Sequence, residues 1–388
     1  MPEAQSTLPF QFATPPQLLL LRAALLEGPA AVEAAEEWFA CSGDAAEQGF
    51  TCLEQGSRRL LPLVYRNVKE ALPIGLRKTL RQICLHYWAE NQKLFRRLED
   101  RLAWFQANGI PTMALKGVAL SVLHYCDKGI RPMSDFDILV PEDLAPDVTA
   151  SLQREGWAIV SYLSDAPQNA YFYRHIHAVS LAHPKHGEFD LHWHVLHAAT
   201  FRGADRAFWD DSVPLSLNTI STRALNPTDQ LLHACVHGFS SNDVAPIRWI
   251  ADALTILRTS QVDWSRLVKL AQHLRVSIPL AATLRFLHDT FPAPIPVAVI
   301  EQLASVRADA SERNYFQRLS KLDRSGPEIL ADNWERHRRA NRDAPAVLRL
   351  ASLPRQFQLH YNLPRLRDLG RLAVSSLGKR VARMVGRP

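Results

Sequence analysis

The chain has 388 residues, of which 47% are hydrophobic and 22% are charged. This is ordinary globular composition, and it excludes the collagen-like, disordered and membrane-spanning classes. A single hydrophobic core stops growing at about 250–300 residues, so we expect two or three subdomains. The formal charge of +6 is concentrated near the C-terminus, because residues 355–388 contain eight Arg and Lys and one acid. The remainder is near neutral, which argues against nucleic-acid binding over the whole protein surface.

Residues 1–107 are predicted to form an N-terminal helical region. Between Leu76 and Phe105, apolar residues recur at three- and four-residue spacing, and charged residues fill the opposite face. Asn108 and Gly109 predict the end of this helix. The leucine run at 18–21 is too short to span a bilayer.

Residues 108–215 are predicted to form an α/β core. The apolar run 110–115, bounded by glycines, is typical of a buried strand, and a helix follows to about Tyr125. A further helix is predicted over 143–155. Strands are predicted in four segments, 135–140, 157–163, 171–181 and 188–195. The expected fold class is α+β, with a small mixed sheet flanked by N- and C-terminal helical regions.

Helices are predicted again over 216–350, where Thr228 and Asp229 can cap the first of them. Arg248 and Asp252 have helical i, i+4 spacing and are expected to pair on the surface. If their helix closes over a cleft, Arg248 would instead contact nucleotide or acceptor.

Residues 351–388 are predicted to form a basic amphipathic tail, in which Leu and Val alternate with Arg and Lys. Such a tail can lie on an anionic membrane or contact a partner. Packing against the protein body and disorder are the alternatives, and together they are favoured. The five cysteines lie far apart without a CxxC pair, and no signal peptide precedes them. Reduced thiols and a cytoplasmic location are therefore expected.

The most informative pattern is RPMSDFDILV at residues 131–140. On a strand, Asp135 and Asp137 would share one face, while Phe136 and Ile138 would point into the core. Two neighbouring carboxylates repel each other, and a hard divalent cation such as Mg²⁺ relieves that repulsion. A bare DxD is more often a solvated strand end, so neighbouring motifs decide between the two interpretations.

Three neighbouring features favour a metal site that acts on a nucleotide. Lys116 and Gly117 are expected at a strand-to-helix turn, where backbone N–H groups and a point charge can hold phosphate. Arg131 can grip a triphosphate or pair with the carboxylates. In the alternating segment EFDLHWH, Asp190 is in place to supply a third carboxylate, with Glu188 as its competitor. Three carboxylates allow two metals.

An LKG turn, the pattern RxxxDxDxLV and a strand that ends in DLHW together resemble the uncharacterised bacterial nucleotidyltransferases of the DNA polymerase β superfamily. The resemblance extends from the helical segment 60–91 to the segment 226–252. It implies a polymerase-β-like nucleotidyltransferase core with metal ligands at Asp135, Asp137 and Asp190. The usual Gly-Ser of the superfamily turn is Gly-Val in this chain.

The expected activity is that of a magnesium-dependent nucleotidyltransferase, with manganese as a possible substitute. A nucleoside monophosphate would move from an NTP to an acceptor hydroxyl or phosphate, with release of pyrophosphate. The three carboxylates would hold two metals, and Lys116, Gly117 and Arg131 would bind the nucleotide. The acceptor is unspecified and is a protein, a peptide, a small molecule or RNA.

Two alternatives to this activity stay open. The first is a non-catalytic nucleotide-binding or antitoxin-like module that retains the fold. The second is a zinc hydrolase, because seven of the 15 histidines lie between residues 175 and 197, and His192 shares a face with Asp190. No HExxH motif is present, and the pair His233 and His237 lacks a general-base Glu. Hydrogen-bonding roles are expected for these histidines, with His192 orienting a metal-binding carboxylate.

Overall fold

The computed structural model describes residues 11–45, 48–161, 163–239, 247–319 and 325–371. The chain divides into two compact units, each built from two stretches of sequence. Unit 1 contains residues 1–139 and 205–324, and unit 2 contains residues 140–204 and 325–388. Strands and helices occur in both units, which confirms the α+β class. The segment boundaries expected after residues 107, 215 and 350 stay predictions.

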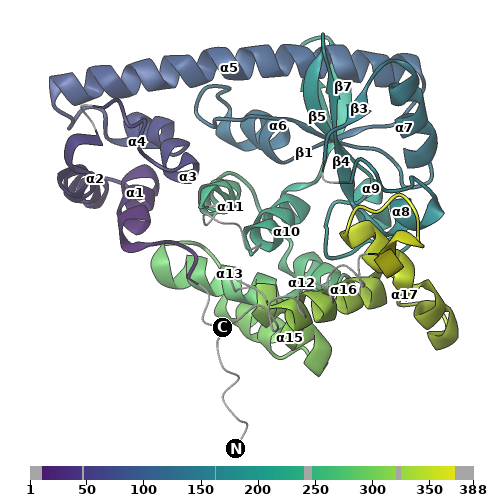
Figure 1. The fold of residues 1–388 in the computed structure, drawn as a ribbon. Coiled ribbons are helices and arrows are strands. Elements are labelled where there is room, and N and C mark those ends of the chain that lie inside the picture. The colour runs from purple at the N-terminus through teal and green to yellow at the C-terminus, as the bar shows by residue number, and fades with distance from the viewer. Residues whose placement is uncertain (1–10, 46–47, 162, 240–246, 320–324, 372–388) are drawn as a thin grey trace, which may run out of the picture. The chain divides into compact units, whose positions relative to one another are not determined.

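Unit 1 begins with short helices and continues into one long helix. The short helices are α1 (Pro15–Leu25), α2 (Pro29–Cys41), α3 (Gln55–Arg58) and α4 (Leu61–Val68). α5 runs from Ile74 to Ala107, and Asn108 caps its C-terminus, as the sequence predicted (Figure 1). The C-terminal half of α5 buries an apolar stripe, and the helix packs against α4. Tertiary packing of such a face supplies most of the stability of a helix.

Four strands of unit 1 are hydrogen-bonded in the order β2-β1-β7-β6. They are β1 (Met113–Leu115), β2 (Asp137–Leu139), β6 (Val213–Leu217) and β7 (Ile220–Ala224). β1 is antiparallel to β2, with Leu115 opposite Asp137, and it is parallel to β7. All three residues of β1 are buried, so an apolar run without alternation is what this central strand requires.

α6 (Lys116–Leu120) follows β1 without an intervening loop and continues into a π-helical turn, Ser121–Tyr125. Lys116 has a φ of +45°, in the left-handed region that costs energy for a residue with a Cβ. The turn between β1 and α6 therefore stores backbone strain at a residue with a charged side chain. Both a strained residue and a π-helical turn are common near functional sites.

One of the remaining helices of unit 1 precedes β6, and the others follow β7. They are α9 (Arg206–Asp210), α10 (Pro227–Gly238), α11 (Arg248–Thr259), α12 (Trp264–His273), α13 (Ser277–Thr290), α14 (Val297–Ala304) and α15 (Ala310–Leu319). α10 starts earlier than predicted, because Asn226 is its N-cap and accepts a hydrogen bond from the backbone of Asp229. α10 packs closely on α11.

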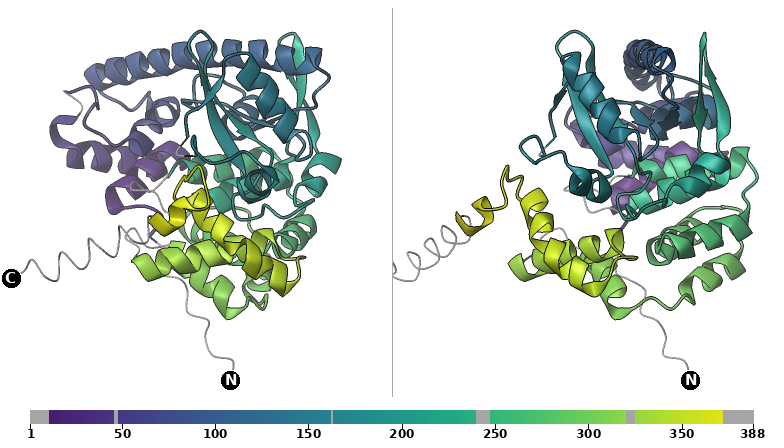
Figure 2. Two further views of the ribbon diagram at one scale, coloured as in Figure 1. Left: turned by 45° about the vertical axis from the view of Figure 1, so that its right-hand side comes forward. Right: turned by 90° about the vertical axis from the view of Figure 1, so that its right-hand side faces the viewer.

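The described residues of unit 2 form three antiparallel strands in the order β3-β4-β5 and four helices. The strands are β3 (Ala158–Ile159), β4 (Ala178–His183) and β5 (Gly187–His192). The helices are α7 (Ala145–Arg154), α8 (Ala170–His175), α16 (Gly326–Ala340) and α17 (Ala346–His360). α16 and α17, the yellow-green and yellow helices of Figure 2, pack against each other and against α8.

The strand predicted over residues 171–181 is wrong for its first half. Asn169 accepts hydrogen bonds from the backbone N–H groups of Tyr171 and Phe172, and this side-chain cap starts α8. Only after a short connection does the chain become β4 at Ala178. A local cap therefore outweighs the alternating pattern in this segment.

The predicted basic tail starts inside a helix, because residues 351–360 form the end of α17. Residues 372–388, which contain Lys379, Arg380, Arg383 and Arg387, lie outside the described residues. Among the residues that the structure describes, no helix has the length and apolar character needed to cross a membrane.

Candidate functional site

Lys116 and Asp137 meet where β1 ends. Lys116 Nζ donates a hydrogen bond to Asp137 Oδ1 over 2.6 Å. Asp137 is 5% exposed, whereas the lysine side chain is 28% exposed. A buried carboxylate without a cation costs several kcal/mol, so this ammonium group is the electrostatic complement of Asp137 within unit 1. The strained turn at Lys116 places the charge next to the neighbouring strand.

Asp135 lies outside the strand on which the sequence placed it. β2 begins at Asp137, and Asp135 is exposed in the preceding segment. Phe136 and Ile138 are buried, as expected. The expectation that both aspartates alternate along one strand is therefore wrong, because the chain before Asp137 is held by side chains instead of ladder hydrogen bonds.

Three side chains fix the segment 131–135. Buried Asn91 of α5 donates to the carbonyl oxygen of Arg131 over 2.9 Å and accepts from the backbone N–H of Met133 over 3.1 Å. Arg59 donates to the Ser134 hydroxyl over 2.9 Å. Arg248 donates to the carbonyl oxygen of Pro132 over 2.8 Å. Sequence reasoning missed Asn91, although an amide within the apolar stripe of α5 was a visible signal.

Arg131 pairs with Asp252 of α11 and not with the aspartates that follow it in sequence. Arg131 Nε and Nη2 donate to the two carboxylate oxygens of Asp252, each over 2.8 Å, and both residues are buried. Tyr125 donates to the same carboxylate over 2.9 Å. Burial acts to raise the pKa of Asp252, but the charge and hydrogen bonds of Arg131 outweigh it and lower that pKa. The surface pair predicted between Arg248 and Asp252 is thus wrong.

Gly117 provides space for the Arg131 side chain. A Cβ atom at position 117 would lie 2.5 Å from Arg131 Nη1 and 2.7 Å from Met133 Sδ. Gly117 does not have a positive φ, so the glycine is required here by close side-chain approach. The close approach holds the guanidinium of Arg131 against the first turn of α6. The predicted role of Gly117 in phosphate binding stays a prediction.

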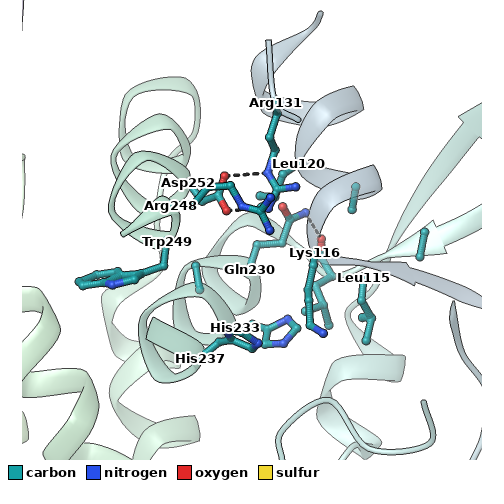
Figure 3. A pocket seen from close by; sticks show the side chains of 14 residues that line it. Leu115, Lys116, Leu120, Arg131, Gln230, His233, His237, Arg248, Trp249 and Asp252 are labelled. Carbon is teal, nitrogen blue, oxygen red and sulfur yellow. Dashed lines mark hydrogen bonds and ion pairs between the residues drawn. The ribbon is translucent and has the colours of Figure 1, made fainter. Parts of the chain in front are cut away.

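A pocket in unit 1 adjoins Lys116 (Figure 3). Its empty space, with the open mouth included, is about 610 Å³. Charged and imidazole side chains reach it from the β1–α6 turn, from α10 and from α11, and an apolar wall completes it. The polar lining consists of Lys116, Arg131, Gln230, His233, His237, Arg248 and Asp252. Because Asp252 is neutralised by Arg131, the lining carries an excess of positive charge.

Arg248 contributes to that excess. Burial, followed by the charge of Arg131, lowers the pKa of Arg248 to about 9, although Asp252 acts in the opposite direction. Arg59 is close enough to lower the same pKa, and exposed Asp135 is close enough to raise it. Three guanidinium groups therefore lie within electrostatic reach of one another, and one of them has a bidentate carboxylate partner.

In unit 2, β5 carries Asp190 and His192 on one face. Asp190 pairs with Ser180 of β4 in the strand register and is half-buried, and His192 is buried. Glu188, the competitor for the role of third carboxylate, is exposed. The backbone N–H of Val140, the first residue of this unit, donates to the carbonyl oxygen of His192 over 2.9 Å. The last residue of the strand that carries Asp190 is therefore hydrogen-bonded to the first residue of unit 2.

The first histidine of segment 175–197 does not lie on the strand that was predicted over residues 171–181. His175 belongs to α8, not to a strand. Its ring stacks on Tyr171 with the ring centres 3.7 Å apart, and its Nε2 is hydrogen-bonded to Asn341. Burial lowers the pKa of His175 to about 3. This histidine is a neutral structural residue of unit 2.

The fold and the site define an α+β protein in which acidic residues lie beside a cationic pocket. A family profile described as an uncharacterised nucleotidyltransferase matches residues 56–292, and the chain belongs to that family. The match covers more than half of the chain and includes all six residues that the sequence predicted for the site. A comparison with curated proteins gives no match. Family membership confirms the resemblance at the level of a nucleotidyltransferase and supports nucleotidyl transfer from an NTP as the general activity.

Proposed function

We propose that the protein is a divalent-metal-dependent nucleotidyltransferase of the DNA polymerase β type. It transfers a nucleoside monophosphate from an NTP to an acceptor hydroxyl or phosphate and releases pyrophosphate. The observation that carries this proposal is the buried Asp137 carboxylate, whose partner is the flexible ammonium group of Lys116 at 2.6 Å. A carboxylate neutralised in this way can exchange its lysine for a metal ion.

The proposed metal ligands are Asp137 and Asp190, with His192 and exposed Asp135 as further donors. Asp137, Asp190 and His192 offer the oxygen and nitrogen atoms that divalent ions take as ligands. When bound, Mg²⁺ or Mn²⁺ neutralises phosphate charge and polarises the attacking oxygen. The sequence predicted that His192 orients a metal-binding carboxylate, whereas in this proposal His192 binds the metal ion directly.

Lys116 changes partner in this mechanism. If Asp137 held an ion, the ammonium group of Lys116 would lose its 2.6 Å contact and would be available to a phosphate oxygen. Arg131 stays bound to Asp252 and holds the first turn of α6 in place through its contact with Gly117. The protein then acts by positioning the triphosphate and neutralising its charge.

The test is transfer of label from α-³²P-labelled NTPs to the protein itself and to components of a cell extract, with Mg²⁺ or Mn²⁺. Asp137→Asn should abolish both label transfer and pyrophosphate release, because an amide is a poor ligand for these ions. Asp143→Asn, at an exposed acid soon after β2, is the matched control and should retain activity. Undiminished turnover in Asp137→Asn would contradict the proposal. Metal-dependent NTP binding without any transfer would indicate the non-catalytic module instead.

A further inference from the structure

We infer that the cationic pocket of unit 1 binds the phosphate chain of the NTP and that Arg248 is its principal phosphate ligand. The inference deepens the proposed function, because the NTP is the source of the phosphate chain. Arg248 lines the pocket together with Lys116, whose ammonium group is bonded to Asp137. The family assignment does not identify this residue as a phosphate ligand. From the sequence, contact of Arg248 with nucleotide or acceptor was only the alternative to a surface pair with Asp252.

The charges around Arg248 support an anionic occupant. Both oxygens of Asp252 are bonded to Arg131, so Arg248 shares the charge of that carboxylate with Arg131, and the other acid within reach of Arg248 and Arg59 is exposed Asp135. Guanidinium groups held near one another repel, and the repulsion is relieved when an anion binds between them. If Asp135 binds a metal ion, its charge no longer offsets that of Arg59 and Arg248, and the repulsion between these two guanidinium groups increases. A phosphate chain supplies several negative oxygens at once.

The geometry of the pocket favours phosphate over a carboxylate ligand. Arg248 uses Nη1 for the Pro132 carbonyl, and its planar group has further N–H donors that can form paired hydrogen bonds with phosphate oxygens. An apolar wall formed by Leu115, Ala119 and Leu120 limits water on one side. Charge-assisted hydrogen bonds are stronger where water is limited. A single carboxylate would leave part of the cationic lining without a partner.

The experiment measures binding of tripolyphosphate and of a non-hydrolysable NTP to the full chain by isothermal titration calorimetry, with and without Mg²⁺. Arg248→Gln should weaken binding of both ligands by about tenfold to a hundredfold, the range expected for loss of charge-assisted hydrogen bonds. Arg248→Lys keeps one donor for Pro132 but loses the fork, so it should fold normally and bind weakly. Arg258→Gln removes an exposed arginine from the same helix and should bind like the wild type.

Several outcomes separate this inference from the proposed function. Unchanged tripolyphosphate binding in both Arg248 variants overturns the inference, whatever the transfer assay shows. If the variants instead lose affinity for a nucleoside monophosphate and keep affinity for tripolyphosphate, the pocket belongs to a phosphorylated acceptor and the inference is overturned. Loss of tripolyphosphate binding in a protein that transfers no label supports the inference while the proposed function fails. Asp137→Asn should keep tripolyphosphate binding without Mg²⁺.

Discussion

Asp137 requires a positive charge in either of the two states proposed for the site. Lys116 supplies that charge in unit 1, and a divalent ion would replace it during activity. Lys116→Met keeps much of the side-chain volume and removes the ammonium group. Because breaking a buried ion pair from one side costs about 3–5 kcal/mol, the melting temperature without metal should fall.

The dependence on metal distinguishes this pair from an ordinary structural ion pair. Differential scanning fluorimetry should show that Mg²⁺ stabilises Lys116→Met more than it stabilises the wild type, since the ion takes over the missing charge. Addition of Asp137→Asn to the variant should restore stability without metal, because the uncompensated carboxylate is gone. Equal effects of Mg²⁺ on the wild type and on Lys116→Met would count against exchange between lysine and metal.

Gly117 illustrates how one missing Cβ atom organises the site. Gly117→Ala should displace Arg131, since the new atom would lie 2.5 Å from Nη1. Overpacking of this kind costs about 1–3 kcal/mol, and the loss should appear in urea denaturation. Gly75→Ala in α5 is the control, because a Cβ at that position meets nothing within 4 Å and improves helix propensity. Similar free energies of unfolding for the wild type and Gly117→Ala would show that Arg131 can move without cost.

His175 makes unit 2 sensitive to acid. Its folded-state pKa of about 3 lies below the ordinary value of 6.5, so the unfolded chain binds the proton more readily. The contribution of His175 is therefore complete above pH 6.5 and is lost as the pH falls toward 3. At pH 4.5 the loss is roughly 2–3 kcal/mol relative to neutral pH.

Urea denaturation at pH 7 and pH 4.5 measures this effect. His175→Phe keeps the stacking on Tyr171 and removes the titrating group, so the difference between the two pH values should shrink. His288→Gln, at an exposed histidine, should leave the difference unchanged. A difference that is the same in His175→Phe and the wild type would assign the acid sensitivity to other groups.

At the scale of elements, the helices α10 and α11 form a close contact that the pocket depends on. A Cβ at Gly238 would lie 2.3 Å from the ring of Trp249, which is buried beside Phe12. Gly238→Ala should therefore force α10 and α11 apart and cost about 1–3 kcal/mol. Because both helices line the pocket, phosphate binding should weaken as well.

Chemical denaturation with a second substitution tests the cause. Trp249→Leu reduces the side chain that meets the new methyl group, so the double variant should be more stable than the sum of the two single effects predicts. Strictly additive effects would contradict a clash between the new methyl group and Trp249. The change in helix propensity cannot replace that clash as the cause, because Gly→Ala raises helix stability by at most about 1 kcal/mol and does not lower it.

Local patterns predicted some of these elements and could not predict others. The end of α5 at Asn108 followed from periodicity and a stop signal, and the buried run before Lys116 correctly indicated a strand. The proximity of Lys116 and Asp137 could have been expected from the sequence, because Lys116 directly follows β1 and Asp137 begins β2. In contrast, Arg131 and Asp252 are separated by 121 positions in the sequence. No periodicity within either segment reveals such a contact, so the pocket had to come from the three-dimensional structure.

At the scale of the molecule, the region that the family profile matches does not coincide with either of the two units. Residues 56–292 contain both candidate carboxylate strands, β2 and β5, but they end before α16 and α17. These two helices complete unit 2 by packing on α8, where the Tyr171 hydroxyl and the His337 ring are hydrogen-bonded over 2.8 Å. The part of the chain that carries the proposed chemistry is therefore stabilised in part by sequence outside the family match.

The interleaved order of the units also determines when each can fold during synthesis. Unit 1 stays incomplete while the ribosome produces residues 140–204, since β1 must await β7, with Met113 opposite Arg223. Unit 2 in turn awaits α16 and α17. Pairing across such sequence distances is slow and leaves apolar surface exposed in the nascent chain. Expression yield should therefore respond to translation speed and to chaperone supply, and no uninterrupted fragment that contains one unit alone can be cut from this gene.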